Sequence, residues 1–117
     1  MEEYKRKYED LKEMANLPSK DTGFSKGFLY ISTQEGNHGA RVKYYRNSPS
    51  QSRPYASISI NKIPRLLVDD IKITSKEFKE VSDFIKLNLK DLLKFWNEGA
   101  YLMKDEQQKL VNSLKTI

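Results

Sequence analysis

The sequence predicts an α+β fold in which a small antiparallel sheet of three to four strands carries helices on one face. Three observations support this prediction. Short segments between residues 27 and 73 alternate apolar and polar residues and are separated by turn-forming residues, which is typical of strands. Longer segments on either side show the apolar spacing of helices. Because the strand-like segments follow one another over short connections, antiparallel pairing is favoured over parallel crossovers.

A single domain is expected, because 117 residues fit one hydrophobic core and leave little room for two. Hydrophobic residues make up 38% of the chain and charged residues 32%, which is the composition of a soluble globular protein. Within residues 1–117 we expect an N-terminal helix at 1–17, the sheet at 27–73 and two C-terminal helices at 75–115. The longer of these two helices is expected to pack on one face of the sheet.

The composition excludes several classes of site. The chain has no cysteine, so disulfide frameworks, thiolate nucleophiles and cysteine-bound zinc are ruled out. His38 is the only histidine, so a site built from several histidines of one chain is excluded as well. We therefore expect neither a metal nor another cofactor.

The chain is expected to be cytoplasmic and to have no membrane partner. Its longest strongly apolar stretches contain only a few residues, far short of the ~20 that a membrane-spanning helix needs. The charged segment from Met1 to Arg6 is not followed by the apolar region of a secretion signal.

Residues 2–16 are expected to form the N-terminal helix. From Tyr4 to Ala15, large or apolar side chains recur at spacings of four, three and four residues, which places them on one helical face. Pro18 ends the pattern, because the residue before a proline avoids helical backbone angles. We expect this face to pack on the domain or on a second copy of the chain.

Three segments have the composition of strands: residues 28–33, 40–46 and 55–60. In the second and third segments apolar residues occupy alternate positions, so one face of each strand is expected to point into the core. The residues expected to point outward are Arg41, Lys43, Tyr45, Tyr55, Ser57 and Ser59. Residues 63–68 are interrupted by Pro64, so they form either an edge strand or an irregular apolar segment. Residues 71–73 are expected to add one short strand.

The C-terminal part of the sequence predicts two helices. Thr74 and Glu77 have the spacing of a capping box, in which each side chain satisfies a free backbone donor of the other residue. A helix is expected from there to about Asn97, ended by Gly99. Its apolar stripe consists of Phe78, Val81, Ile85, Leu89, Leu92 and Trp96. The last helix is expected over residues 103–115.

The charge distribution favours an anionic partner. The net charge is +5, but residues 36–68 contain six lysines and arginines and no carboxylate, so the remaining residues together carry −1. Lysine and arginine neutralise phosphates and tyrosines stack on bases, so RNA or DNA is the favoured partner. The predicted contact residues are Arg41, Lys43, Tyr45, Arg46, Arg53 and Tyr55, with Lys62 and Arg65 at the edge.

Two other interpretations involve the turn before the second strand. Residues 36–39 form a Gly-x-x-Gly sequence like the loop that holds a nucleic-acid backbone in KH domains, but here both neighbouring segments are strand-like, so a tight hairpin turn is the better interpretation. His38 beside basic residues is a weak candidate for the general base or acid of a metal-independent ribonuclease. No convergent set of titratable groups identifies a reaction, so binding is favoured over catalysis.

A protein–protein interaction module is the main alternative to nucleic-acid binding. The apolar face of residues 2–16 and additional apolar residues in the helices are typical of a surface that binds a second copy or another protein. A dimeric regulator, a toxin–antitoxin-like component or an inhibitor would each use such a surface.

Three segments of the chain resemble a small bacterial domain family of unknown function. They are residues 37–42 (Asn-His-Gly-Ala-Arg-Val), the alternating segment 56–60 with Pro64, and the helix end 91–96 (Asp-Leu-Leu-Lys-Phe-Trp). The resemblance spans about residues 37–97. Members of that family are often encoded in toxin–antitoxin-like or mobile-element settings, so the resemblance implies a small bacterial accessory protein and specifies no activity. The family usually begins with Pro-Pro-His-x-His, of which this chain has only His38.

Overall fold

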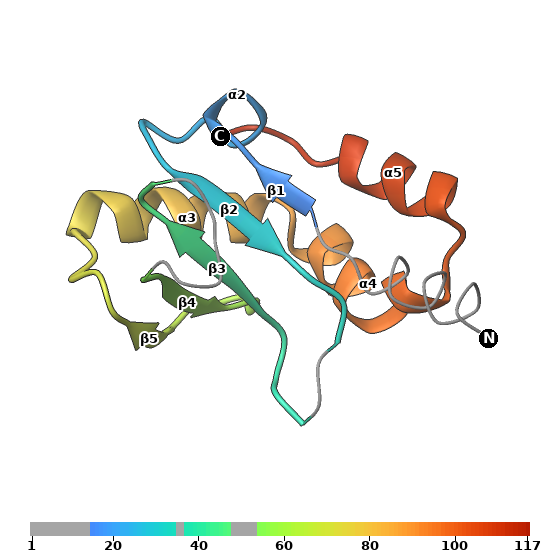
Figure 1. Ribbon diagram of the computed structural model, residues 1–117, viewed down its shortest axis with the longest axis horizontal. Helices are drawn as coiled ribbons and strands as arrows, with labels where there is room; N and C mark the ends of the chain where they lie inside the picture. The colour runs from blue at the N-terminus through green and yellow to red at the C-terminus, as the bar shows by residue number, and fades with distance from the viewer. Residues whose placement is uncertain (1–14, 35–36, 48–53) are drawn as a thin grey trace.

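The computed structural model describes residues 15–34, 37–47 and 54–117. Five strands form one antiparallel sheet in the order β1-β2-β3-β4-β5, so every strand pairs with its neighbours in the sequence (Figure 1). The strands are β1 (Ala15–Leu17), β2 (Phe28–Ile31), β3 (Arg41–Tyr45), β4 (Ala56–Ser59) and β5 (Leu66–Asp69). The α+β class and the antiparallel pairing are therefore confirmed.

Helices follow the sheet in the chain: α3 (Ser75–Leu87), α4 (Leu89–Glu98), the 3-10 helix η1 (Gly99–Tyr101) and α5 (Lys104–Asn112). A short helix, α2 (Ser19–Thr22), joins β1 to β2, and α5 lies beside the β1 edge of the sheet. In Figure 1, α3 and α4 lie behind the sheet, so the opposite face is turned toward the reader. We call this opposite face the outer face.

The core lies between the sheet and α3. Neighbouring strands place apolar residues side by side, because the register pairs Leu29 with Tyr44 and Val42 with both Ile31 and Ile58. All of these side chains are buried. The residues that α3 contributes to the core are Val81, Phe84 and Ile85. Burial of each large apolar side chain contributes about 1.5–3 kcal/mol, so the alternation in the strands and the stripe on the helix are the main determinants of this packing.

Gly27 allows the chain to enter β2 beside the core. Its φ is +89°, a left-handed conformation that side chains other than glycine rarely adopt. A Cβ atom at this position would lie 2.6 Å from the hydroxyl oxygen of Tyr44. Both the backbone angle and the close approach of the Tyr44 ring therefore require glycine.

The sheet has five strands, one more than the upper limit predicted, and the fifth arises where a helix was expected. Residues 15–17, predicted as the end of the N-terminal helix, form β1 and pair with β2. The prediction was wrong for these residues, because tertiary pairing buries Leu17 against the core and outweighs local helical spacing. Residues 1–14 lie outside the described residues.

Residues 66–69 form the edge strand β5, which agrees with the first of the two expectations for the Pro64 segment. The short strand expected at 71–73 is absent. The Asp69 carboxylate explains this difference, because it accepts hydrogen bonds from the backbone amides of Ile71 and Ile73 at 3.0–3.3 Å. A side chain that takes these donors competes with the pairing of a strand.

The helix expected from residue 75 to about residue 97 is divided in two. α3 begins at the predicted capping box, in which Glu77 N donates to Thr74 Oγ1 at 3.1 Å and Thr74 N donates to Glu77 Oε1 at 2.9 Å. Asn88 separates α3 from α4 with φ −114° and ψ 23°, which is not helical. The last helix, α5, ends at Asn112, three residues before the predicted end.

No helix within the described ranges is both long and apolar enough to cross a membrane.

Candidate functional site

The outer face is formed by the alternate residues of β2, β3 and β4 that point away from the helices. The register places Lys43 between Tyr30 of β2 and Ser57 of β4, and it places Arg41 beside Ser59. The outward direction predicted for Arg41, Lys43 and Ser57 agrees with this arrangement. Strand geometry alone therefore brings cations, hydroxyl groups and aromatic rings onto one surface.

The Lys43 ammonium lies between two aromatic rings at the centre of the outer face. Its Nζ atom is 4.9 Å from the ring centroid of Tyr55 and 5.7 Å from that of Tyr30. The Tyr45 ring contacts both, with its centroid 6.3 Å from that of Tyr30 and 5.7 Å from that of Tyr55. Cation–π contacts of this kind hold the charge in place and contribute about 0.5–2 kcal/mol each.

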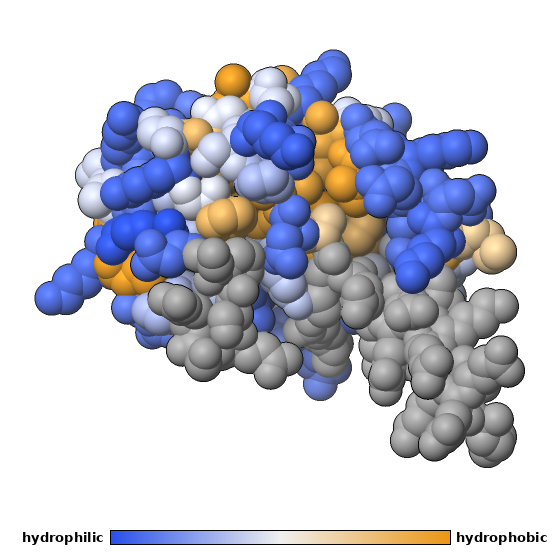
Figure 2. All heavy atoms as spheres, turned by 45° about the horizontal axis from the view of Figure 1, so that its top comes forward, coloured by the Kyte–Doolittle hydropathy of each residue, from blue (hydrophilic) through white to orange (hydrophobic). Residues whose placement is uncertain are grey.

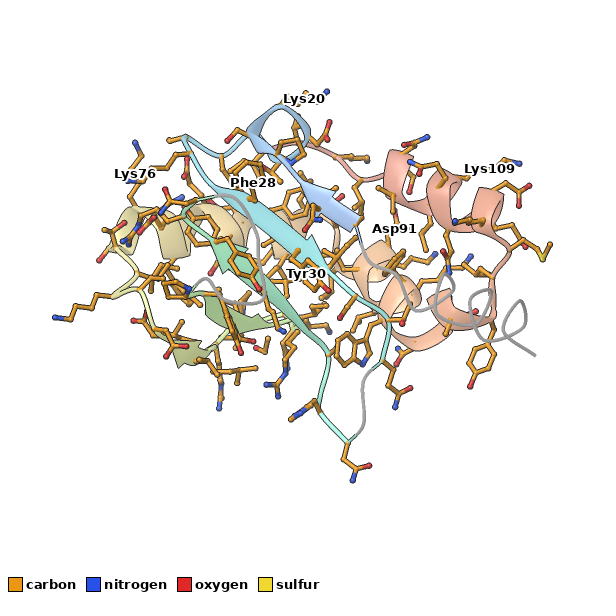
Figure 3. The ribbon with its side chains drawn as sticks, viewed as in Figure 1. Lys20, Phe28, Tyr30, Lys76, Asp91 and Lys109 are labelled. Atoms are coloured by element: carbon orange, nitrogen blue, oxygen red, sulfur yellow. The ribbon has the colours of Figure 1, made fainter. Side chains whose placement is uncertain are left out.

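A cavity of about 220 Å³ opens on the outer face beside Lys43. Figure 3 shows Tyr30, one of its lining residues, on β2. The full lining consists of Tyr30, Ser32, His38, Arg41, Lys43, Tyr55, Ser57, Val68 and Trp96. None of these residues is acidic, so the cavity combines positive charge and hydroxyl donors with aromatic walls. Such a lining suits an anionic group attached to a planar ring.

Ser57 is the most deeply buried polar residue of this lining. Its side chain is 1% exposed, and its hydroxyl oxygen has no hydrogen-bond partner among the described residues. A buried hydroxyl without a partner costs roughly 1–3 kcal/mol, so native proteins seldom retain one.

The structure brings together four of the eight predicted contact residues. Arg41, Lys43 and Tyr55 line the cavity, and Tyr45 lies behind them in contact with Tyr55. Tyr45 is only 6% exposed, and burial, followed by the proximity of Tyr55, raises the pKa of its phenol. It therefore supports the surface and does not present a free ring.

Arg46, predicted as a contact residue, lies elsewhere. Its Nε and Nη2 atoms donate to the two carboxylate oxygens of Glu77 at 2.9 and 2.8 Å. Alternate residues of a strand point to the same face, so residue 46 points inward as residues 42 and 44 do. Its side chain therefore lies toward the start of α3. The hydrogen bond from Arg46 lowers the pKa of Glu77 to about 2, with Thr74 and Tyr44 adding to the effect against the opposing effect of burial.

The remaining predicted contacts are not part of the cavity. Lys62 and Arg65 are exposed in the connection between β4 and β5 and do not line it. Arg53 lies outside the described residues.

Sequence reasoning missed four site residues: Tyr30, Ser32, Val68 and Trp96. Tyr30 carried a usable signal, because it alternates with Leu29 and Ile31 and therefore had to point outward. Trp96 carried no such signal, because its position in the apolar stripe of its helix predicts a core residue. It reaches the cavity because Gln34 N donates to Trp96 O at 2.7 Å, which ties the end of α4 to the segment after β2.

His38 lines the same cavity as Arg41 and Lys43. The lining contains no carboxylate and no second histidine, so it lacks the usual partner for general acid–base catalysis. Across the described residues, no group of three or more histidine, aspartate and glutamate side chains is arranged to hold a metal ion.

A larger groove of about 460 Å³ lies between β1, α2 and α5. Figure 2 turns the top of the view in Figure 1 toward the reader and shows apolar atoms there among hydrophilic ones. Lys20 and Asp21 both line the groove, so it has no excess of one charge. The cavity on the outer face is therefore the better candidate for a specific anionic ligand.

Comparison with protein-family models, curated proteins and solved structures finds no match for this chain. The outer face is therefore interpreted from its own geometry.

Proposed function

We propose that the protein binds single-stranded nucleic acid, RNA or DNA, through the outer face of its sheet. The observation that carries the proposal is the position of Lys43, whose ammonium lies 4.9 and 5.7 Å from two tyrosine ring centroids beside a cavity without carboxylates. Modules that hold single strands combine cations for the phosphates with aromatic rings for the bases, often on a sheet.

The charges on the two sides of the sheet support this proposal. Arg46 points toward the helices and is neutralised by Glu77 at 2.8 Å. Arg41 and Lys43 on the outer face form no ion pair among the described residues. Unpaired cations release counterions from a phosphate backbone when they bind it, which is the main source of sequence-independent affinity.

The shape of the outer face favours a single strand over a duplex. Duplex DNA is usually read by a helix or a β-ribbon that enters the major groove. Here α3 and α4 cover the opposite face of the sheet, and the outer face offers half-buried tyrosine rings and a cavity. Unpaired bases can stack on such rings, whereas the bases of a duplex are already stacked on one another.

Binding of a short mixed-sequence single-stranded RNA, measured by fluorescence anisotropy over a range of salt concentrations, tests the proposal. Lys43→Gln is expected to weaken binding several-fold and to reduce the slope of log K against log salt by ~0.7, the value for one phosphate contact of a single strand. Tyr55→Leu is expected to weaken binding by ~5- to 150-fold, because a stacked base contributes about 1–3 kcal/mol.

The matched control is Lys86→Gln, which removes the same charge from an exposed lysine in the last turn of α3. It is expected to leave both the affinity and the salt slope almost unchanged. Equal losses in Lys43→Gln and Lys86→Gln would contradict the proposal, and so would binding that does not respond to salt.

A protein–protein interface along β5 is the second candidate. β5 is an edge strand, and its Leu66 and Leu67 are 41% and 43% exposed, with Ile63 at 71% just before it. Exposed apolar residues on an unpaired strand edge favour pairing with another chain. Sedimentation velocity tests this candidate, since a dimer that dissociates in Leu67→Asp would support it and a monomer at high concentration would contradict it.

A further inference from the structure

We infer that the cavity on the outer face binds the terminal phosphate of a nucleotide, with the adjoining base against its aromatic walls. The inference rests on the proposed function and narrows it, because the strand would then be recognised by its phosphorylated end. It is carried by Ser57, Arg41 and Lys43, whose positions suit a dianionic phosphate monoester.

The hydroxyl of Ser57 is a donor that the protein itself leaves unused. It is buried in the cavity lining without a partner among the described residues, and its residue pairs directly with Lys43 across β3 and β4. Both side chains lie on the same face, and the Ser57 hydroxyl is covered by its neighbours. An anion that draws the Lys43 ammonium aside would uncover this hydroxyl and accept a hydrogen bond from it. An anion in this place would satisfy the buried hydroxyl.

Arg41 is oriented toward the same ligand. Its Nε donates to the backbone carbonyl of Gly39 at 3.1 Å, which fixes the guanidinium at the cavity. Its two terminal nitrogens form no hydrogen bond with the described residues, so they remain able to bind two oxygens of one phosphate. His38 adds a third basic group to the lining.

The charge of the lining matches a monoester better than an internal phosphodiester. A terminal phosphate carries about −1.5 to −2 charges at neutral pH and three acceptor oxygens, whereas each internal phosphate carries one charge. Arg41 and Lys43 together supply two positive charges, with no carboxylate in the lining to offset them.

The size of the cavity leads to the same ligand. At about 220 Å³ it is smaller than the ~300–1,000 Å³ pockets that hold drug-sized ligands, so it accommodates no more than a single nucleotide of a strand. Trp96 from α4 and Val68 from β5 contribute apolar walls beside the charged side chains. A terminal nucleotide can offer both a phosphate and a flat ring to such a lining.

Competition binding with three forms of one oligonucleotide tests the inference. The forms carry a 5′-phosphate, a 3′-phosphate or no terminal phosphate, and adenosine monophosphate serves as the free-nucleotide probe. We expect one phosphorylated form to bind at least tenfold more tightly than the unphosphorylated form. Ser57→Ala is expected to weaken binding of the phosphorylated form by about tenfold or more, the usual effect of losing a hydrogen bond to a charged group, and so to remove most of that preference.

Ser82→Ala is the matched control. The Ser82 hydroxyl is also buried without a partner, but it lies on α3 and does not line the cavity. Both variants remove a buried hydroxyl without a partner, so neither is expected to lower the thermal stability of the protein. Only Ser57→Ala is expected to lose the preference for a terminal phosphate.

The outcomes separate this inference from the proposed function. Equal binding of all three oligonucleotides, with no competition by adenosine monophosphate, would overturn the inference and leave the proposed function intact. Binding of adenosine monophosphate without binding of any strand would support the phosphate site and refute the proposed function. An equal loss of preference in Ser57→Ala and Ser82→Ala would also overturn the inference.

Discussion

Glu77 connects the sheet to the start of α3. It is 3% exposed, and its carboxylate accepts hydrogen bonds from Arg46, from the Tyr44 hydroxyl at 2.9 Å and from the backbone amide of Thr74. Buried carboxylates are stable only when they are paired in this way. Burial and the hydrogen bond to Glu77 raise the pKa of Tyr44, so its phenol stays protonated and continues to donate.

The pKa of Glu77 predicts how stability depends on pH. Its folded value of about 2 lies below its ordinary value of 4.5, so its charged form stabilises the folded state above pH 4.5. This contribution is lost as the pH falls from 4.5 toward 2. Removal of a charge from a fully buried pair typically costs about 3–5 kcal/mol. The Arg46 side chain is 33% exposed, so water partly solvates the charge left behind, and we expect Glu77→Gln to lose about 2 kcal/mol at pH 7.

Urea unfolding of both proteins from pH 7 to pH 2 measures this difference. The gap in unfolding free energy between parent and variant is expected to narrow as the pH falls toward 2, because the Glu77 carboxyl is then about half protonated in the folded protein and almost fully protonated in the unfolded chain. Glutamine keeps one acceptor oxygen for the capping box but replaces the other by a donor group, so the variant loses hydrogen bonds as well as the charge. The part of the gap that changes with pH is the part due to the charge. A gap that stays constant with pH would contradict the role assigned to the Glu77 carboxylate.

At the level of elements, the division between α3 and α4 is made by a distant segment. The Asn88 side chain donates to Phe84 O at 3.1 Å and to Lys115 O at 2.9 Å, and it accepts from Lys115 N at 2.7 Å. The apolar stripe from Phe78 to Trp96 contains no interruption, which explains why the sequence predicted one helix. Asn88 is buried, so these hydrogen bonds replace the ones that water would provide.

Asn88→Ala is expected to destabilise the protein by roughly 2–3 kcal/mol, because the backbone groups of Lys115 lose their partners. Hydrogen exchange at the Lys115 amide should become faster in the same variant. Asn97→Ala, which changes an exposed asparagine of α4, is the control and should alter stability by less than ~0.5 kcal/mol. Equal stability of the two variants would show that Asn88 does not hold the C-terminal segment.

The strands show how much local sequence predicts within an element. The alternation of residues 40–46 correctly assigned Val42 and Tyr44 to the core and Lys43 to the outer face. The same alternation assigns Arg46 to the inner side of the sheet. We predicted it as a contact residue of the outer face only because it belongs to the basic segment 36–68, and that prediction was wrong. Where periodicity and composition disagree within a strand, periodicity is the better guide, because it reflects backbone geometry.

At the scale of the whole molecule, the C-terminal segment packs against α2, near the start of the described chain. Ile117 N donates to Thr22 O at 2.9 Å, and Figure 1 shows the C-terminal end beside α2. Leu114 packs against the core cluster. Gly23 permits this approach, since a Cβ atom there would lie 2.6 Å from Ile117 O.

Deletion of residues 114–117 is therefore expected to cost about 2–4 kcal/mol, through the lost contacts of Leu114 and Ile117 and the exposed side chain of Asn88. Hydrogen exchange followed by mass spectrometry should show faster exchange in β1 and α2 than in β3 and β4. Uniform acceleration across all strands, or none, would contradict this distribution of stability.

The faces of β3 and β4, the capping box before α3 and the α+β class follow from local spacing, because the direction of each side chain repeats along a regular backbone. The cavity on the outer face does not follow from it, since His38, Ser57 and Trp96 come from segments far apart in the chain. The pairing of β1 and the break at Asn88 likewise depend on partners that are distant in sequence. Burial of one shared core brings those partners together. Contacts between residues that are distant in the chain cannot be predicted from the spacing of residues within one segment.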